Sequence, residues 1–249
     1  MAVVGGLPQF KKASDIAGKT GLGLLIFGPP GVGKTTLAST AQDSEFGRDV
    51  LFFETDPTGA DSIKDRADIS LWPDPDGPKP TWKEFRTVVD QVVAAGKDSP
   101  YKTLVFDSIS SIYDDLIKVK VTGSVEKQPQ LNQWGECNRL LIKFMMDVLS
   151  LNSQGINTIF IGHTREERDE DTVLIRLAGT PQARDEILRN IGNVGYYDFD
   201  RRKTKRILTL RPQPKVDGPK FRQPLSGNQM PLEFTDPIMH QILEHARKV

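Results

Sequence analysis

The feature that most limits the fold is the run Gly28-Pro-Pro-Gly-Val-Gly-Lys-Thr35, which matches the spacing G-x-x-x-x-G-K-[ST] at every fixed position. An apolar segment, Gly23–Phe27, precedes this run, and a segment that favours a helix, Lys34–Ala41, follows it. A strand, a glycine-rich turn and a helix in that order bring backbone N–H groups and the positive end of a helix around an anion. The sequence therefore predicts a loop that wraps a chain of phosphates.

The residues of this loop have different expected roles. Glycine lets the backbone approach phosphate oxygens without a clash at Cβ. We expect Lys34 to reach the β- and γ-phosphates and to serve catalysis, and we expect the Thr35 hydroxyl to bind Mg²⁺. The predicted nucleotide-binding residues are Gly28, Pro29, Pro30, Gly31, Val32, Gly33, Lys34, Thr35 and Thr36.

Acidic and polar residues follow other apolar runs. Asp107 ends the run Thr103–Phe106 and is the predicted second ligand of Mg²⁺, with a plain helix cap as the alternative. Glu54 and Asp56 follow a second run and share one face if the strand continues, so either could orient the attacking water; the longer reach of Glu54 favours it, with Asp56 as the alternative. His163 follows a third run, where it could sense the γ-phosphate, although a lone histidine is also common as a structural residue.

Strand-like and helix-like segments alternate over the first two thirds of the chain, and this order predicts a parallel sheet covered on both faces. The last third is rich in strands with short connections, which favours antiparallel strands added to the same sheet. The predicted fold class is therefore α/β, with three layers, a mainly parallel central sheet and antiparallel strands from the C-terminal third. We expect an N-terminal arm over residues 1–20 and one domain over residues 21–249.

Individual elements are also predicted. The spacing of Thr81 and Glu84 predicts a capping box on a helix that continues to Ala95. The remaining expectations are a mobile loop over 121–130, a strand over 157–162 with a charged turn after it, strands over 173–177, 194–199 and 207–210, and helices over 181–190 and 236–247.

Composition excludes several classes of protein. The chain of 249 residues has no run of 18 apolar residues, no start typical of a secretory signal and a single cysteine, Cys137, so we expect a cytoplasmic protein with no membrane span. Its 33 basic and 33 acidic residues cancel, so contact with nucleic acid would require a local patch.

Taken in order, the segments GPPGVGKTT, FFETD, TLVFDSISSIYDDL and NTIFIGHTR resemble the RecA-like ATPase core over roughly residues 20–225. The compact size and short N-terminal arm are similar to phage-encoded nucleotide-binding proteins, several of which act in single-strand annealing or recombination. The resemblance implies ATP and Mg²⁺ as cofactors, hydrolysis stimulated by single-stranded DNA, and a location in the bacterial host cytoplasm if a phage encodes the chain.

The resemblance also implies roles for particular residues. The family's catalytic base matches Asp56, with Glu54 two residues earlier, and family members usually have Glu at that position. DNA-facing loops would fall on residues 121–130 and 164–190. A homo-oligomer would place basic side chains of a neighbouring copy at the γ-phosphate, and a single-strand-binding protein is a further expected partner. The basic residues that match this late segment are Lys215, Lys220 and Arg222.

The charges of the candidate DNA-binding segments differ. Residues 163–190 carry five basic and seven acidic side chains, whereas residues 196–222 carry nine basic and three acidic ones. The basic segment 196–222 could be a solvated hairpin, or it could contact phosphates or a neighbouring subunit. Tyr196 and Tyr197 could stack on bases but are more typical of strand packing. Two other functions remain open: an ATPase that works through protein partners, and a small-molecule kinase in which the Arg165–Arg168 stretch forms a lid.

Overall fold

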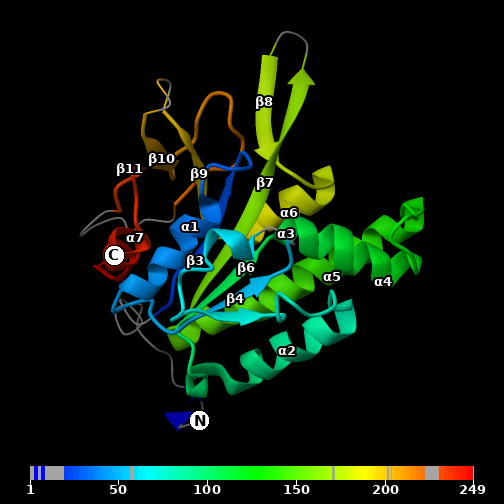
Figure 1. Ribbon diagram of the computed structural model, residues 1–249, viewed down its shortest axis with the longest axis horizontal. Helices are drawn as coiled ribbons and strands as arrows, with labels where there is room; N and C mark the ends of the chain where they lie inside the picture. The colour runs from blue at the N-terminus through cyan, green and yellow to red at the C-terminus, as the bar shows by residue number, and fades with distance from the viewer. Residues whose placement is uncertain are drawn as a thin grey trace.

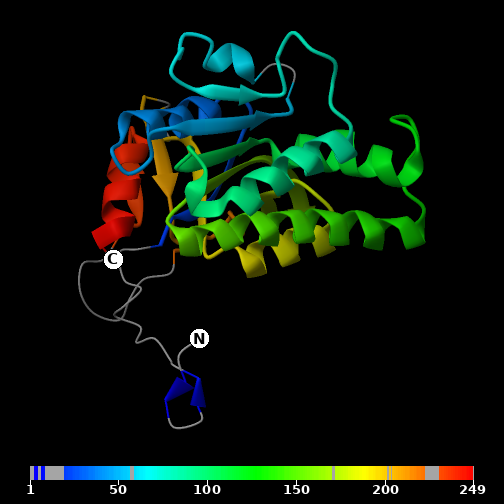
Figure 2. The ribbon, with the colours of Figure 1, turned by 90° about the horizontal axis from the view of Figure 1, so that it is seen from below.

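The computed structural model describes residues 3–4, 7–8, 20–56, 59–169, 172–200, 202, 204–221 and 230–248. A central sheet lies between two groups of helices, as Figures 1 and 2 show. The strands are β3 (Gly23–Gly28), β4 (Val50–Glu54), β5 (Ser70–Trp72), β6 (Thr103–Asp107), β7 (Asn157–Asp169), β8 (Thr172–Leu177), β9 (Asn193–Phe199), β10 (Arg206–Thr209) and β11 (Glu233–Thr235). A separate pair, β1 (Val3–Val4) and β2 (Leu7–Pro8), lies in the segment predicted as an arm.

The order of strands across the sheet is β11-β10-β9-β3-β7-β6-β4-β5, and β8 lies off this path and pairs with β7. The strands from β5 to β9 in this order run parallel, and β10 and β11 are antiparallel additions at the β9 edge. The predicted three-layer α/β fold with a mainly parallel sheet is therefore confirmed. One detail differs from the expectation, because β9 belongs to the last third of the chain and yet pairs in parallel with β3.

The helices are α1 (Lys34–Ser39), α2 (Trp82–Ala95), α3 (Ile109–Ser111), α4 (Lys118–Thr122), α5 (Leu131–Leu149), α6 (Pro181–Asn190) and α7 (Met239–Lys248). A π-helical segment, Ile112–Ile117, joins α3 to α4. Apolar side chains alternate between the two faces of the strands, so Leu25 and Phe27 pack toward α2, α5 and α6 while Leu24 and Ile26 pack toward α1 and α7. The capping box of α2 is confirmed, with the Thr81 N–H donating to Glu84 Oε2 at 2.8 Å.

Stacked phenylalanines hold the strands that end at the predicted site. The ring of Phe106 on β6 stacks on Phe53 of β4 at 4.7 Å and on Phe160 of β7 at 5.3 Å between centroids. Phe144 of α5 meets Phe106 edge-on at 5.1 Å, and all four rings are fully buried. Aromatic pairs in these arrangements stabilise a core beyond the area that they bury. The packing fixes the three neighbouring strands relative to one another, and with them the residues at their carboxyl ends.

The charged turn predicted after residue 162 is wrong, because β7 continues as a strand to Asp169 and forms an antiparallel hairpin with β8. Figure 1 shows this hairpin projecting beyond the sheet. One ion pair joins its two strands, since Glu167 accepts from Arg176 at 2.6 Å, and Glu167 also accepts from Arg184 of α6 at 3.0 Å. This ion pair and the backbone pairing replace the apolar alternation that marks a half-buried strand.

None of the helices in the described ranges is both long enough and apolar enough to cross a membrane.

Candidate nucleotide site

The predicted site residues meet at the carboxyl ends of adjacent strands. In the register of the sheet, Gly28 at the end of β3 lies opposite His163 on β7, and Glu54 at the end of β4 lies opposite Asp107 at the end of β6. Because β3, β7, β6 and β4 are consecutive and parallel, these residues share one edge of the sheet. This edge is where open α/β sheets bind ligands.

The loop between β3 and α1 contains two glycines with positive φ angles, as the predicted phosphate loop requires. Gly31 and Gly33 adopt φ angles of 75° and 95°, a region that side chains with a Cβ rarely enter. A Cβ on Gly28 would lie 2.0 Å from the Tyr197 carbonyl oxygen of β9, so glycine is required there for the two strands to approach. The conformation and the close approach explain why glycines occupy these positions.

The Lys34 ammonium group points back onto this loop. Its Nζ donates to the carbonyl oxygens of Gly28 at 3.0 Å and of Pro29 at 2.8 Å, and the residue is 5% exposed. Burial lowers the pKa of Lys34, while the negative charges of Asp107 and Asp56 act in the opposite direction. An anion in the loop would add to the negative charge that stabilises the buried ammonium.

Thr35 and Asp107 form the predicted metal-binding pair. The Thr35 hydroxyl donates to Asp107 Oδ2 at 2.5 Å, and Asp107 is 4% exposed. Burial raises the pKa of Asp107 to about 6, against the lowering effects of the Thr35 hydrogen bond and the Lys34 charge. A hydroxyl and a carboxylate are oxygen ligands of the kind that Mg²⁺ prefers, so the residues present fit this ion.

The two candidates for the catalytic base differ in their surroundings. Glu54 is 8% exposed, and its Oε1 accepts from the Asp56 backbone N–H at 2.9 Å. Burial, with the nearby charge of Asp107 as the next cause, raises the pKa of Glu54 to about 9. The Asp56 side chain is 28% exposed, and its Oδ2 lies 3.9 Å from Nε2 of His163. Water therefore has better access to Asp56 than to Glu54.

His163 completes the row of polar residues along the strand ends. Its side chain is 33% exposed and lies between the charge of Lys34 and that of Asp56. Burial lowers the pKa of His163, and the positive charge of Lys34 lowers it further. The neutral imidazole is favoured as a result, and it can donate or accept one hydrogen bond next to the phosphate loop.

Comparison with known proteins gives the family. A family model described as an AAA domain matches residues 20–220, which cover every site residue described above. The chain belongs to the AAA domain family. Among solved structures, it is similar to a crystal structure of the RadB recombinase, with 17% sequence identity, a TM-score of 0.44 and coverage of 80% of this chain and 85% of that chain. A search of curated proteins gives no match.

One residue of this AAA domain beside the loop was not predicted. Arg206 of β10 donates from Nε to the Val32 carbonyl oxygen at 2.8 Å, and its guanidinium lies over the ring of Phe199 at 5.4 Å. A Cβ on Gly33 would lie 3.4 Å from Arg206 Nε. Arg206 belongs to the basic segment 196–222, which the sequence indicated as a solvated hairpin or as a phosphate or subunit contact, but not as a contact with this loop.

The late basic residues Lys215 and Lys220 contact other parts of the fold. Lys220 donates from Nζ to the Leu188 carbonyl oxygen, and Lys215 lines a surface cavity with Tyr196 and Asp198. Arg222 lies outside the described residues.

The two tyrosines are packing residues. Tyr196 and Tyr197 are 6% and 3% exposed, and the Tyr196 ring lies 5.5 Å from that of Phe27. They are therefore buried within the fold, which favours the packing role over stacking on bases.

Proposed function

We propose that this AAA domain binds ATP with Mg²⁺ at residues 28–36 and hydrolyses it. The observation that carries the proposal is the convergence of Lys34, Thr35, Asp107, Asp56 and His163 along four consecutive strand ends. Each residue type matches a need of phosphoryl transfer: a cation for the phosphates, two oxygen ligands for the metal, and an acid near the expected position of the γ-phosphate.

Each residue of the site has its own role in the proposed reaction. The loop glycines and the Lys34 ammonium bind the β- and γ-phosphates, and the Thr35 hydroxyl and the Asp107 carboxylate would hold Mg²⁺. When bound, that ion neutralises charge on the phosphate oxygens. Asp56 orients the attacking water and accepts its proton, because its carboxylate is accessible to water whereas that of Glu54 is buried. Glu54 acts as a positioning residue, since its Oε1 holds the backbone N–H of Asp56.

We further propose that the protein acts on single-stranded DNA in homologous recombination or strand annealing, with a phage as its source. This part rests on the RecA-like resemblance and on exposed cations at two projecting parts of the fold. Arg165 and Arg168 lie on the β7–β8 hairpin, Lys120 lies in the last turn of α4, and Lys127 lies between α4 and α5. A homo-oligomer in which Lys215, Lys220 and Arg222 approach a neighbour's ATP belongs to the same proposal.

The test is the ATPase rate with and without single-stranded DNA, together with the affinity for a labelled strand as salt is raised. We expect stimulated turnover and binding that weakens steeply with salt, because contacts to phosphates release counterions. A lack of affinity for any single strand at low salt would refute the DNA-binding part and leave ATP hydrolysis standing.

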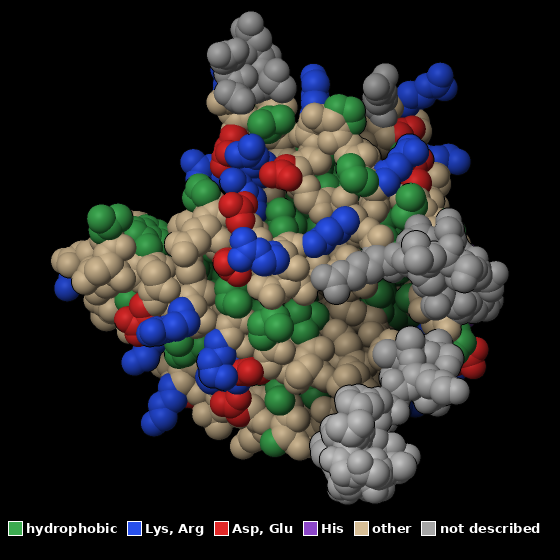
Figure 3. Space-filling view, turned by 180° about the vertical axis from the view of Figure 1, so that it is seen from behind, with side chains coloured by type: hydrophobic (Ala, Val, Ile, Leu, Met, Phe, Trp, Pro, Cys, Tyr) green, Lys and Arg blue, Asp and Glu red, His purple; other side chains and the backbone are tan. Residues whose placement is uncertain are grey.

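A second candidate function is an ATPase that works through protein partners. The observation in its favour is charge neutralisation on the hairpin, where Glu167 pairs with both Arg176 and Arg184. On the face seen in Figure 3, Lys and Arg side chains are interspersed with Asp and Glu. Oligomerisation that depends on nucleotide, together with an ATPase rate that does not change when DNA is added, would favour this second candidate function.

A further inference from the structure

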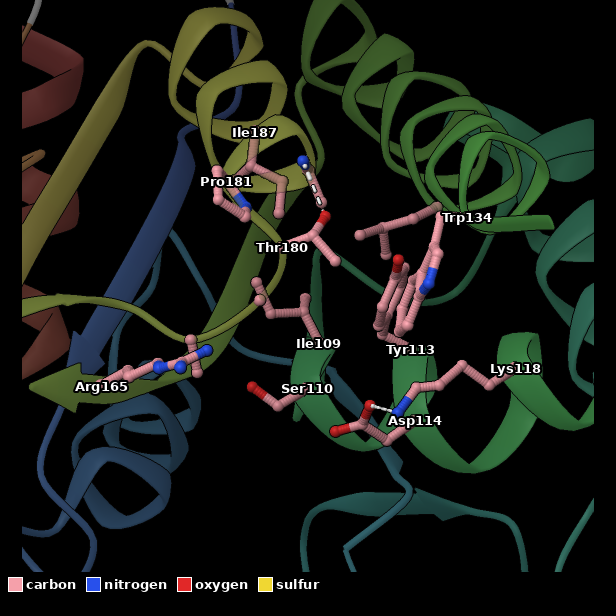
Figure 4. Close-up of a pocket in the computed structure, with 14 residues that line it drawn as sticks. Ile109, Ser110, Tyr113, Asp114, Lys118, Trp134, Arg165, Thr180, Pro181 and Ile187 are labelled. Atoms are coloured by element: carbon pink, nitrogen blue, oxygen red, sulfur yellow. Dashed lines mark hydrogen bonds and ion pairs between the residues drawn. The ribbon is translucent and has the colours of Figure 1, made fainter. Parts of the chain in front are cut away.

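A cavity of about 450 Å³ lies next to the nucleotide site but does not include any of its residues. Figure 4 shows it between the segment that begins with α3, the helices α5 and α6, and the base of the β7–β8 hairpin. Its volume falls within the range of roughly 300–1,000 Å³ that is typical of small-molecule sites. The cavity is therefore large enough to enclose one planar ring system with its substituents.

The walls of the cavity are flat and mostly apolar. Tyr113 and Trp134 stack with 6.5 Å between ring centroids and an angle of 20° between ring planes, and together they form one wall. Ile109 and Ile187 face them across the cavity in Figure 4. A planar ring between an aromatic wall and an aliphatic one gains stacking and apolar contacts on both of its faces.

Polar groups stand at the edges of this slot. The Ser110 hydroxyl oxygen is buried and has no hydrogen-bond partner among the described residues, which is unusual for a buried polar atom. Asp114 and Lys118 form an ion pair of 2.7 Å in the lining. The exposed Arg165 also lies in the lining and forms no ion pair within the described part of the chain.

We propose that this cavity binds a single nucleobase that is unstacked from single-stranded nucleic acid. The inference rests on the DNA-binding part of the proposed function. The slot takes the flat faces of the base, the Ser110 hydroxyl bonds to its polar edge, and the Arg165 guanidinium contacts the adjoining phosphate. Unstacked bases are recognised by this combination of stacking and hydrogen bonds to the base edge. A purely apolar peptide side chain would leave Ser110 without a partner.

The cavity shares two segments with the nucleotide site. Ser110 follows Asp107 by three residues, and Arg165 follows His163 by two residues on the same strand. A base in the cavity therefore contacts the segments that carry the metal-binding acid and the polar residue beside the phosphate loop. This arrangement gives a strand of DNA a short physical connection to the state of the ATP site.

The test compares two strands of equal length and charge, one with thymine bases and one with abasic sites. The readout is the ratio of their affinities in fluorescence anisotropy, with Mg-ADP saturating the ATP site. The wild-type protein is expected to prefer the thymine strand by about tenfold, because stacking of a base on aromatic side chains is worth about 1–3 kcal/mol. Ser110→Ala should reduce the preference by about three- to tenfold through one lost hydrogen bond.

Arg165→Ala should weaken binding of the thymine strand more than binding of the abasic strand, because a base held in the cavity places its adjoining phosphate at Arg165. Arg168→Ala is the matched control for this variant. It removes the same charge from the same strand outside the cavity, so it should weaken both strands equally and leave the ratio unchanged. Ser110→Leu, which narrows the slot, is a second variant and should abolish the preference. Melting temperatures check that each variant folds.

Each outcome has a separate meaning. If Ser110→Ala binds both strands as the wild type does, the cavity inference is wrong while DNA binding stands. If neither strand binds at low salt, the DNA-binding proposal fails and the inference fails with it. If thymidine monophosphate binds in the cavity more tightly than the strand, the occupant is a free nucleotide and the inference is wrong. If the variants change only self-association, the cavity takes a side chain of a second copy, and the inference is again wrong.

Discussion

Replacing Thr35 by valine should show how much the predicted metal-binding pair, Thr35 and Asp107, contributes to the stability of the protein. Valine keeps the shape of threonine but loses the hydroxyl that donates to Asp107 Oδ2 at 2.5 Å. Asp107 is 4% exposed, so water cannot readily replace the lost donor. A hydrogen bond to a charged group contributes about 1.5–3 kcal/mol, and a buried acceptor left alone costs a similar amount.

The loss should be visible without nucleotide. For a domain of this size, 1 kcal/mol shifts the melting temperature by about 2–4 °C, so Thr35→Val should melt roughly 3–12 °C lower than the wild type. The same change should also weaken the stabilisation by Mg-ATP, which amounts to about 2.7 kcal/mol at a ligand concentration of 100 times Kd. Thr35→Ser is the matched control, because it keeps the hydroxyl and should preserve most of both effects.

The assay is a thermal melt of all three proteins with and without Mg-ATP, followed by a double-mutant cycle with Asp107→Asn. A coupling energy near zero in that cycle would show that the two side chains do not act together. If Thr35→Val also melts at the wild-type temperature and gains the full shift from Mg-ATP, then the pair has no energetic role and the proposed metal ligands are wrong.

Three further changes test the site. Lys34→Ala should lower ATP turnover by at least about a hundredfold, because electrostatic stabilisation of the transferring phosphate is lost; phosphate release measures this, and an unchanged rate would contradict the loop assignment. Asp56→Asn should bind ATP but release no phosphate, whereas Glu54→Gln should keep measurable turnover; the reverse result would make Glu54 the base. Gly28→Ala should unfold at a lower temperature by several degrees, since its Cβ would lie 2.0 Å from the Tyr197 carbonyl oxygen; an unchanged melting temperature would mean that β3 and β9 can separate at no cost.

The sequence was sufficient to predict the strand ends that form the nucleotide site. Buried parallel strands appear in the sequence as short continuous apolar runs. The polar residue after each run must lie at the edge of the sheet where the carboxyl ends of these strands meet. Glu54, Asp107 and His163 were identified by this argument, and the register of the strands brings them together. The capping box at Thr81 was equally predictable, because its signal is local.

The second half of β7 could not be predicted in the same way. Residues 164–169 are mostly charged, and they form a strand because β8 supplies backbone hydrogen bonds and an ion pair from Arg176 to Glu167. The cavity beside Ser110 also escaped prediction, since its walls come from four separate segments of the chain. The contact of Arg206 with the loop depends on β9 lying between β10 and β3, which only the tertiary fold decides.

The uninterrupted course of β7 has a mechanical consequence. Its 13 residues span about 40 Å, with six residues on either side of His163. The first half is clamped between β3 and β6, and pairing with β8 begins at Thr164, one residue beyond His163. One continuous strand thus joins the hairpin to His163 at the candidate site, so a displacement of the hairpin would be passed along β7 to the imidazole.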